Sequence, residues 1–304
     1  MDDLQQSIFK TVAFFDLFSY PLTSWEIFKW LYNPAEKYSY QTVLTKILEL
    51  EKENKLNHNQ GFYFLPQEND LVKTRLLNYS LAQVKYRRAK KFVKVISYFP
   101  WIKAICVCNN LAYNNAKEES DIDLFIITAP KRMWLSRLLV VGFLKIIHSR
   151  PNQNNKQDTI DTAFFATTNS LNFSDLILKD EDPYFTYWLE QLVPLYGPLS
   201  FAEKVREANS WLQKTLPNTN GVSSIMNRQK IISEKSWEHK PYKIFNWLEA
   251  LAKTIQLQIM PEQLKTTAKE NNTGVVMNER WLKFHSPDKR MEYKNSWQKK
   301  YETN

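Results

Sequence analysis

Glycine is scarce in this sequence, and its scarcity excludes several nucleotide-binding motifs. Only 5 of the 304 residues are glycine. No two of them lie close enough together to form a GxGxxG turn or a GxxxxGK[ST] loop. The sequence therefore excludes both a dinucleotide-binding loop of the Rossmann type and a P-loop.

Cysteine and histidine are also rare. Cys106 and Cys108 are the only two cysteines, and they lie two residues apart in an apolar segment. In a strand both side chains would point to one face, and we favour buried free thiols over a redox pair or a metal site. The 4 histidines are scattered along the sequence, which argues against a zinc site.

The sequence has no long uncharged apolar run. The most apolar stretch, residues 133–147, contains Arg137 and Lys145 and is shorter than the roughly 20 residues that a membrane-spanning helix needs. The first ten residues carry two acids where a signal peptide carries bases. We therefore expect a cytoplasmic protein with no membrane partner.

Hydrophobic and basic residues are plentiful. Hydrophobic residues make up 43% of the chain and aromatic residues 14%, as in an ordered globular protein. The 41 Lys and Arg residues exceed the 32 Asp and Glu residues, which gives a net charge of +9. This balance favours an anionic partner such as a nucleotide or a nucleic acid.

Residues 1–66 have the pattern of a winged-helix domain, with three helices closed by a hairpin. An apolar helical stripe ends at Pro21, and a capping box from Thr23 to Glu26 begins a second helix. A third helix is predicted at about residues 39–53, followed by a hairpin that ends at Leu65. The third helix carries polar residues such as Lys46 but also three glutamates, so DNA binding and a structural or protein-docking role both remain open.

A connecting helix is predicted within residues 67–99, and its second half is strongly basic. The basic residues are Lys85, Arg87, Arg88, Lys90, Lys91 and Lys94. Such a run is either a solvated helix face or a surface that contacts phosphates.

The strongest chemical signal lies just after this helix. Residues 105–108 form an apolar strand, Asn109-Asn110 a turn, and residues 121–127 a second strand that begins with Asp121 and Asp123. Strand periodicity places these two carboxylates on one face. Two carboxylates so placed can bind Mg²⁺, which bridges the phosphates of a nucleotide.

This segment resembles the minimal nucleotidyltransferase superfamily, which includes DNA polymerase beta-like proteins. Its signature is an apolar strand, Gly-Ser, about ten residues, and then Ser-Asp-x-Asp. Ser120, Asp121 and Asp123 match the second half, whereas Asn109-Asn110 stands where Gly-Ser is expected. Asn is the residue that best replaces glycine in left-handed backbone, and its amide can donate to phosphate.

With the winged-helix pattern and Phe62-Tyr63-Phe64-Leu65 ahead of this segment, and Phe284-His285-Ser286-Pro287-Asp288 behind it, the chain resembles one bacterial subgroup of these proteins. The resemblance implies an α+β fold with an N-terminal winged helix (1–66), a connecting helix (67–99), a mixed-sheet nucleotidyltransferase-like domain (100–200) and a helical C-terminal region (201–304). It also implies that Asp121 and Asp123 bind Mg²⁺ and that Asn109, Asn110 and Ser120 contact the nucleotide. Members usually add a third carboxylate from a later strand, for which Asp161 is the candidate and Asp158 the fallback.

The implied function is Mg²⁺-dependent transfer of a nucleoside monophosphate from an NTP to an acceptor hydroxyl. The acceptor is a nucleic acid, a protein or a small molecule. One alternative is a catalytically degenerate protein whose winged helix binds DNA or a protein. Another is a modifier of the toxin–antitoxin type that nucleotidylates a protein or a tRNA end.

Overall fold

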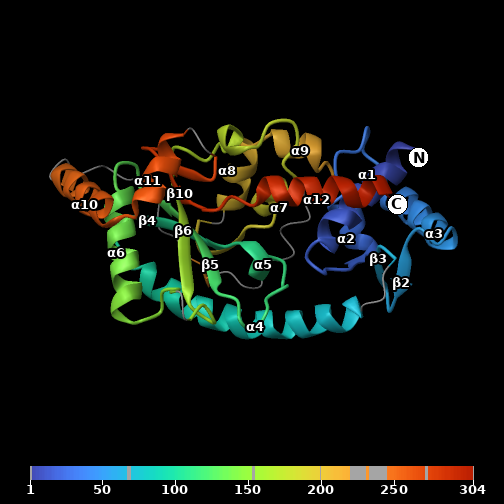
Figure 1. Ribbon diagram of the computed structural model, residues 1–304, viewed down its shortest axis with the longest axis horizontal. Coiled ribbons are helices and arrows are strands. Elements are labelled where there is room, and N and C mark those ends of the chain that lie inside the picture. Colours follow the sequence, from blue (N-terminus) through green and yellow to red (C-terminus); the bar gives the residue numbers. More distant parts are fainter. Residues whose placement is uncertain are drawn as a thin grey trace.

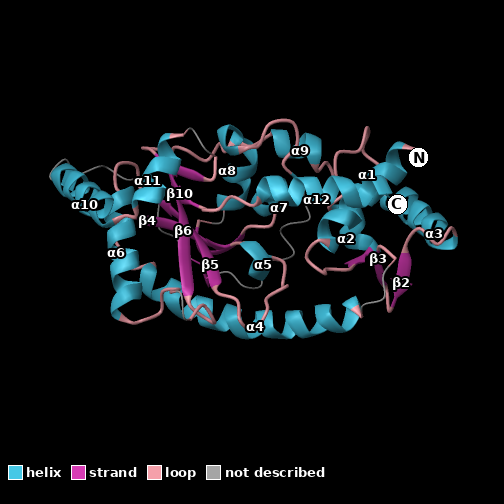
Figure 2. Ribbon diagram, viewed as in Figure 1, coloured by secondary structure: helices cyan, strands magenta, loops and turns pink. Residues whose placement is uncertain are grey.

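The computed structural model describes residues 2–66, 70–152, 155–198, 200–219, 231–232, 245–270 and 273–303. The fold is mixed α and β, with one large sheet, one small sheet and helices around both (Figure 2). The predicted α+β class with a mixed sheet and a mainly helical C-terminal region is confirmed at this level.

The large sheet has seven strands in the order β8-β7-β4-β5-β6-β10-β9. Their bounds are β4 (Ile102–Val107), β5 (Ile122–Thr128), β6 (Ile160–Thr167), β7 (Val193–Gly197), β8 (Ile231–Ile232), β9 (Val275–Met277) and β10 (Trp281–Phe284). The central strand β5 is antiparallel to β4 and parallel to β6. The parallel pair is joined through α6 (Met133–Ile146), because parallel neighbours need a crossover connection.

Helices cover both faces of this sheet. One face packs against α4 (Leu71–Ile96), α6 and α10 (Asn246–Ile259), whereas the other packs against α7 (Pro183–Glu190), α8 (Phe201–Ala208) and α9 (Trp211–Thr215). Strand alternation separates the two cores: Ile126 faces the first and Phe125 the second. Cys106 and Cys108 lie in the second core as buried thiols that form no disulfide with each other, as predicted.

The N-terminal residues form three helices and a small sheet. The helices are α1 (Asp3–Asp16), α2 (Ser24–Lys29) and α3 (Tyr40–Lys52), and the strands β1 (Leu22–Thr23), β2 (Asn57–Asn59) and β3 (Phe62–Phe64) pair in the order β1-β3-β2. The predicted capping box is present, because Thr23 and Glu26 each accept a hydrogen bond from the other's backbone amide. The predicted hairpin, β2–β3, is also confirmed.

The last helix, α12 (Arg290–Thr303), joins the N-terminal helices to the rest of the chain (Figure 1). Trp297 and Tyr301 lie in the same apolar cluster as the side chains of α1, and the Trp297 indole donates to the Lys10 carbonyl at 2.7 Å. Tyr187 of α7 belongs to this cluster too. The N-terminal helices therefore share a core with α7 and α12.

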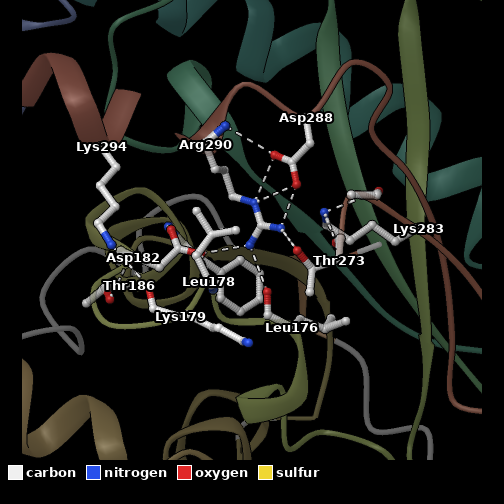
Figure 3. A network of polar contacts seen from close by, with 12 residues as sticks. Leu176, Leu178, Lys179, Asp182, Thr186, Thr273, Lys283, Asp288, Arg290 and Lys294 are labelled. Atoms are coloured by element: carbon white, nitrogen blue, oxygen red, sulfur yellow. Dashed lines mark hydrogen bonds and ion pairs between the residues drawn. The ribbon is translucent and has the colours of Figure 1, made fainter. Parts of the chain in front are cut away.

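A buried ion-pair network holds the start of α12 (Figure 3). The Arg290 guanidinium donates to Asp182 at 2.8 Å, to the Leu176 carbonyl at 2.8 Å, and to both carboxylate oxygens of Asp288. It also donates to the Thr273 hydroxyl at 2.7 Å. One side chain thus ties together segments more than 100 residues apart in the sequence.

The C-terminal region is mainly helical, in α8, α9, α10, α11 (Glu262–Lys269) and α12, but β8 joins the sheet beside β7, and β9 and β10 extend it beside β6. These strands were not expected, because segments of two to four residues show no clear alternation. Along α10, which is apolar on one side, Trp247, Leu251 and Ile255 remain 62%, 47% and 39% exposed. The helix instead buries Ala252 and Gln256 against α6.

No helix within the described ranges is both long enough and apolar enough to cross a membrane.

Candidate metal site

Three carboxylates converge at the start of the parallel strand pair. Asp121 immediately precedes β5, Asp123 is its second residue, and Asp161 is the second residue of β6. Asp123 and Asp161 are direct partners in the strand register. Each of the three offers one oxygen, and these oxygens lie within 4.8 Å of one another. Such a cluster of oxygen donors can hold a metal ion.

A β-bulge is what brings Asp161 to the correct face. Asp123 pairs with Asp161 and Phe125 with Phe164, so β6 contains one residue more than β5 over this stretch. Asp161 and Phe164 are three residues apart, and in a regular strand they would face opposite sides of the sheet. The extra residue shifts the alternation and places Asp161 on the face of Asp123.

Residues on either side of this stretch also indicate a bulge in β6. Ile122 and Ile160 pair at the strand start and lie in the core on the other face. Phe165 lies in that same core although it is five residues after Ile160. In a regular strand, residues an odd number of positions apart face opposite sides, so β6 contains a bulge between them.

The electrostatics of the cluster are those of a cation site. Burial and the charge of Asp161 raise the pKa of Asp121. Burial and the charges of Asp121 and Asp161 raise the pKa of Asp123 well above its usual range. Burial raises the pKa of Asp161 as well. Mutual repulsion of this kind is relieved when a cation binds between the carboxylates.

Basic side chains surround the cluster. Lys156 and Lys85 act to lower the pKa of Asp121 against the effect of burial, and Arg150 and Arg137 do the same for Asp161. Lys156 is exposed, whereas Lys85 is buried. The site therefore combines clustered carboxylates with a basic rim, which suits a metal ion that carries anionic ligands.

The loop at Asn109-Asn110 opens the short helix α5 (Asn109–Ala112). Asn109 has a φ of 54°, the left-handed conformation that glycine adopts most readily. Its side chain hydrogen-bonds Asp123, and its Oδ1 accepts from the Tyr184 hydroxyl at 3.4 Å. Asn110 lies next to it, but its Oδ1 accepts a hydrogen bond from the Tyr113 hydroxyl at 2.6 Å. Of the two asparagines, Asn109 is therefore the one whose side chain is bonded to the carboxylate cluster in the described structure.

The two other residues singled out from the sequence hold the loop before β5. The Ser120 hydroxyl donates to the Lys117 carbonyl at 2.9 Å, within its own turn. The Ser120 carbonyl accepts from Lys85 Nζ at 2.7 Å, and the same ammonium donates to Asp158 at 2.8 Å. Asp158 is therefore the partner of Lys85, and Asp161 is the third member of the cluster.

A cavity of about 180 Å³ lies beside this site, and no pattern in the sequence predicts it. Tyr184, which bonds Asn109, forms part of its wall, together with Phe164, Lys283 and His285. Burial and the nearby Arg290 lower the pKa of Lys283 to about 7, and burial and Lys283 lower that of His285 to about 3. The signal for Lys283 in the sequence is weak because β10, which carries it, has only four residues.

Comparison of the chain with protein-family models, with curated proteins and with solved structures finds no match.

Proposed function

We propose that this protein is a Mg²⁺-dependent nucleotidyltransferase that moves a nucleoside monophosphate from an NTP to an acceptor hydroxyl. The observation that carries the proposal is the convergence of Asp121, Asp123 and Asp161 within 4.8 Å on two adjacent strands. On this view the large sheet with its helices is a nucleotidyltransferase-like domain, and α1–α3 with the small sheet form a winged helix.

Asp121 and Asp123 would hold the metal. Bound Mg²⁺ would neutralise these carboxylates and withdraw charge from the phosphates of the nucleotide. Oxygen ligands of this type suit Mg²⁺.

The residues of the chain would orient the substrates and move one proton. The acceptor hydroxyl oxygen forms a bond to the α-phosphorus while the bond to the bridging oxygen of pyrophosphate breaks. Asp161, whose pKa is raised by burial, accepts the hydroxyl proton. Lys156 and Arg150 at the basic rim would face the phosphate oxygens.

The test is nucleotide binding by the purified protein in the presence and absence of Mg²⁺. We expect the wild type to bind NTP in Mg²⁺ and to lose most of its affinity in EDTA. The double variant Asp121→Ala/Asp123→Ala should show no Mg²⁺-dependent binding, a loss of at least ~100-fold, because both metal ligands are gone. A matched control, Glu118→Ala/Glu119→Ala, removes two exposed acids nearby and should bind as the wild type does. Binding that is absent in the wild type, or unchanged in the Asp double variant, contradicts the proposal.

A second candidate is a degenerate nucleotidyltransferase-like protein that acts through its N-terminal domain. Two observations favour it: Asn109-Asn110 replaces Gly-Ser, and the Ser120 hydroxyl is bonded within its own turn. Lys46 of α3 is paired with Asp2 and Glu49 at 2.9 and 2.7 Å. A lysine engaged in this way favours a protein partner over DNA for this helix.

Replacing Asn109-Asn110 by Gly-Ser separates the two candidates. The substitution Asn109→Gly suits the backbone, because glycine adopts the left-handed conformation of Asn109 without strain. A gain in NTP affinity of more than ~10-fold in Asn109→Gly/Asn110→Ser indicates a degenerate site. A loss indicates that the asparagines themselves contact the nucleotide.

A further inference from the structure

The exposed side of α4 forms a groove that is basic along its edge and apolar at its base. The groove has a volume of about 540 Å³. It is lined by Val84, Arg87, Arg88, Lys91, Phe92, Val95, Phe143 and Asp158. Figure 1 shows α4 running along one long side of the molecule, beside the lower ends of β5 and β6 in that view.

The basic residues of α4 include a buried one with a structural role and exposed ones that face the groove. Lys85 is 3% exposed and donates to Asp158 and to the Ser120 and Glu118 carbonyls, so it is a structural clamp. Arg87, Arg88 and Lys91 are exposed, and within the described part of the chain they form no ion pair with a carboxylate. Three cations are therefore available at the groove to an anionic partner.

The one acid at the groove is already neutralised. Asp158 accepts from Lys85 at 2.8 Å, and its charge is shared with that ammonium. The groove thus presents net positive charge, which is the complement of a phosphate backbone.

The base of the groove decides which polyanion fits. Val84 and Val95 are 52% and 42% exposed, and the half-buried Phe92 and Phe143 lie beside them. The Arg88 guanidinium lies 5.7 Å from the centre of the Phe92 ring. Cations beside aromatic and apolar surface are the arrangement that binds unpaired bases and their phosphates together, whereas a duplex keeps its bases stacked inside.

The groove also leads toward the carboxylate cluster. Lys85 ties α4 to the Ser120 carbonyl, one residue before Asp121, and to Asp158 at the groove edge. The Asp158 amide donates to the same Ser120 carbonyl at 3.1 Å. An extended polymeric ligand lying along the groove would therefore reach the loop that positions Asp121.

We infer that the α4 groove is a binding site for single-stranded nucleic acid. Arg87, Arg88 and Lys91 contact phosphates, and Phe92 with its apolar neighbours contacts bases. The inference goes beyond the proposed transfer reaction, because this binding needs neither the metal nor the nucleotide.

The test is fluorescence anisotropy with a labelled 15-nucleotide single strand, as RNA and as DNA, in EDTA and ~100 mM salt. The variant Arg87→Gln/Arg88→Gln/Lys91→Gln should bind at least ~10-fold more weakly than the wild type, and its salt slope should fall by about 2, since each phosphate contact on a single strand contributes about 0.7. Val84→Glu, which adds a carboxylate at an exposed position in the groove, should also weaken binding.

Matched variants show whether the position of the charges matters. Lys214→Gln/Lys253→Gln/Lys269→Gln removes three exposed lysines elsewhere and should change affinity less than ~2-fold. Asp121→Asn/Asp123→Asn should still bind the strand, so failure of the proposed reaction would leave this result unchanged. No binding by the wild type, equal losses in both triple variants, or preference for a duplex or for anionic lipid vesicles overturns the inference.

Discussion

Replacing Arg290 by Met is expected to lower the free energy of unfolding by about 3–5 kcal/mol, because it leaves a buried charge without its partner. The side chains of Arg290 and Asp182 are 4% and 1% exposed. Asp182 keeps hydrogen bonds from the Leu178 and Phe185 amides, but it loses the only cation that the described structure pairs with it. The loss also releases the start of α12 (Figure 3).

The effect is measured by urea unfolding, with Arg280→Met as the matched control. Arg280 pairs with Asp175 at the same distance of 2.8 Å, but these side chains are 53% and 58% exposed. An exposed pair contributes about 0–1 kcal/mol, so the control should unfold close to the wild type. Equal effects in the two variants would contradict the structural role assigned to Arg290.

The second large effect is expected at the carboxylate cluster, where removing a charge should stabilise the metal-free protein. Burial and two neighbouring carboxylates raise the pKa of Asp123. Because the unfolded chain ionises this group at a lower pH than the folded chain does, stability falls as pH rises through the raised pKa. At pH 7.5 in EDTA, Asp123→Asn should therefore be about 1–3 kcal/mol more stable than the wild type, which corresponds to a Tm higher by about 2–5 °C.

The same variant should lose its response to metal. Addition of ~10 mM Mg²⁺ should raise the Tm of the wild type, because an ion that binds only the folded state stabilises it, and should leave that of Asp123→Asn unchanged. At pH 4 the two proteins should differ little, and Glu119→Gln, at an exposed acid nearby, should match the wild type at every pH. A wild type that is more stable than Asp123→Asn in EDTA at pH 7.5 would show that the three carboxylates do not repel one another.

Part of the site could be predicted from the sequence because it depends on local periodicity. Asp121 and Asp123 are two residues apart at a strand start, so any β-strand there places them on one face. Asp161 is different, because its face depends on the bulge in β6, which simple alternation along that strand does not indicate. The sequence points to Asp161 only through the resemblance, and the pairing of β6 with β5 places its side chain on the face of Asp123.

Other features depend on tertiary contacts that no local pattern contains. Lys85 belongs to a run of basic residues that looks uniform in the sequence, yet only its ammonium is buried against Ser120 and Asp158. The apolar stripe of α10 looks like a core face, but the helix contacts α6 through the small side chain of Ala252 and through Gln256, whose amide bonds the Trp134 carbonyl. Whether each of these side chains is buried depends on which helices and strands pack against it in the folded protein.

The central claim, that Asp121 and Asp123 hold a divalent cation beside Asp161, is tested most directly by titrating the protein with Mn²⁺ and following the free ion by electron paramagnetic resonance. We expect saturable binding by the wild type that tightens when NTP is present, and loss of that binding in both Asp121→Asn and Asp123→Asn. Glu118→Gln should titrate as the wild type does. Mn²⁺ binding that is absent in the wild type, or that persists unchanged when either aspartate is replaced, would contradict the account.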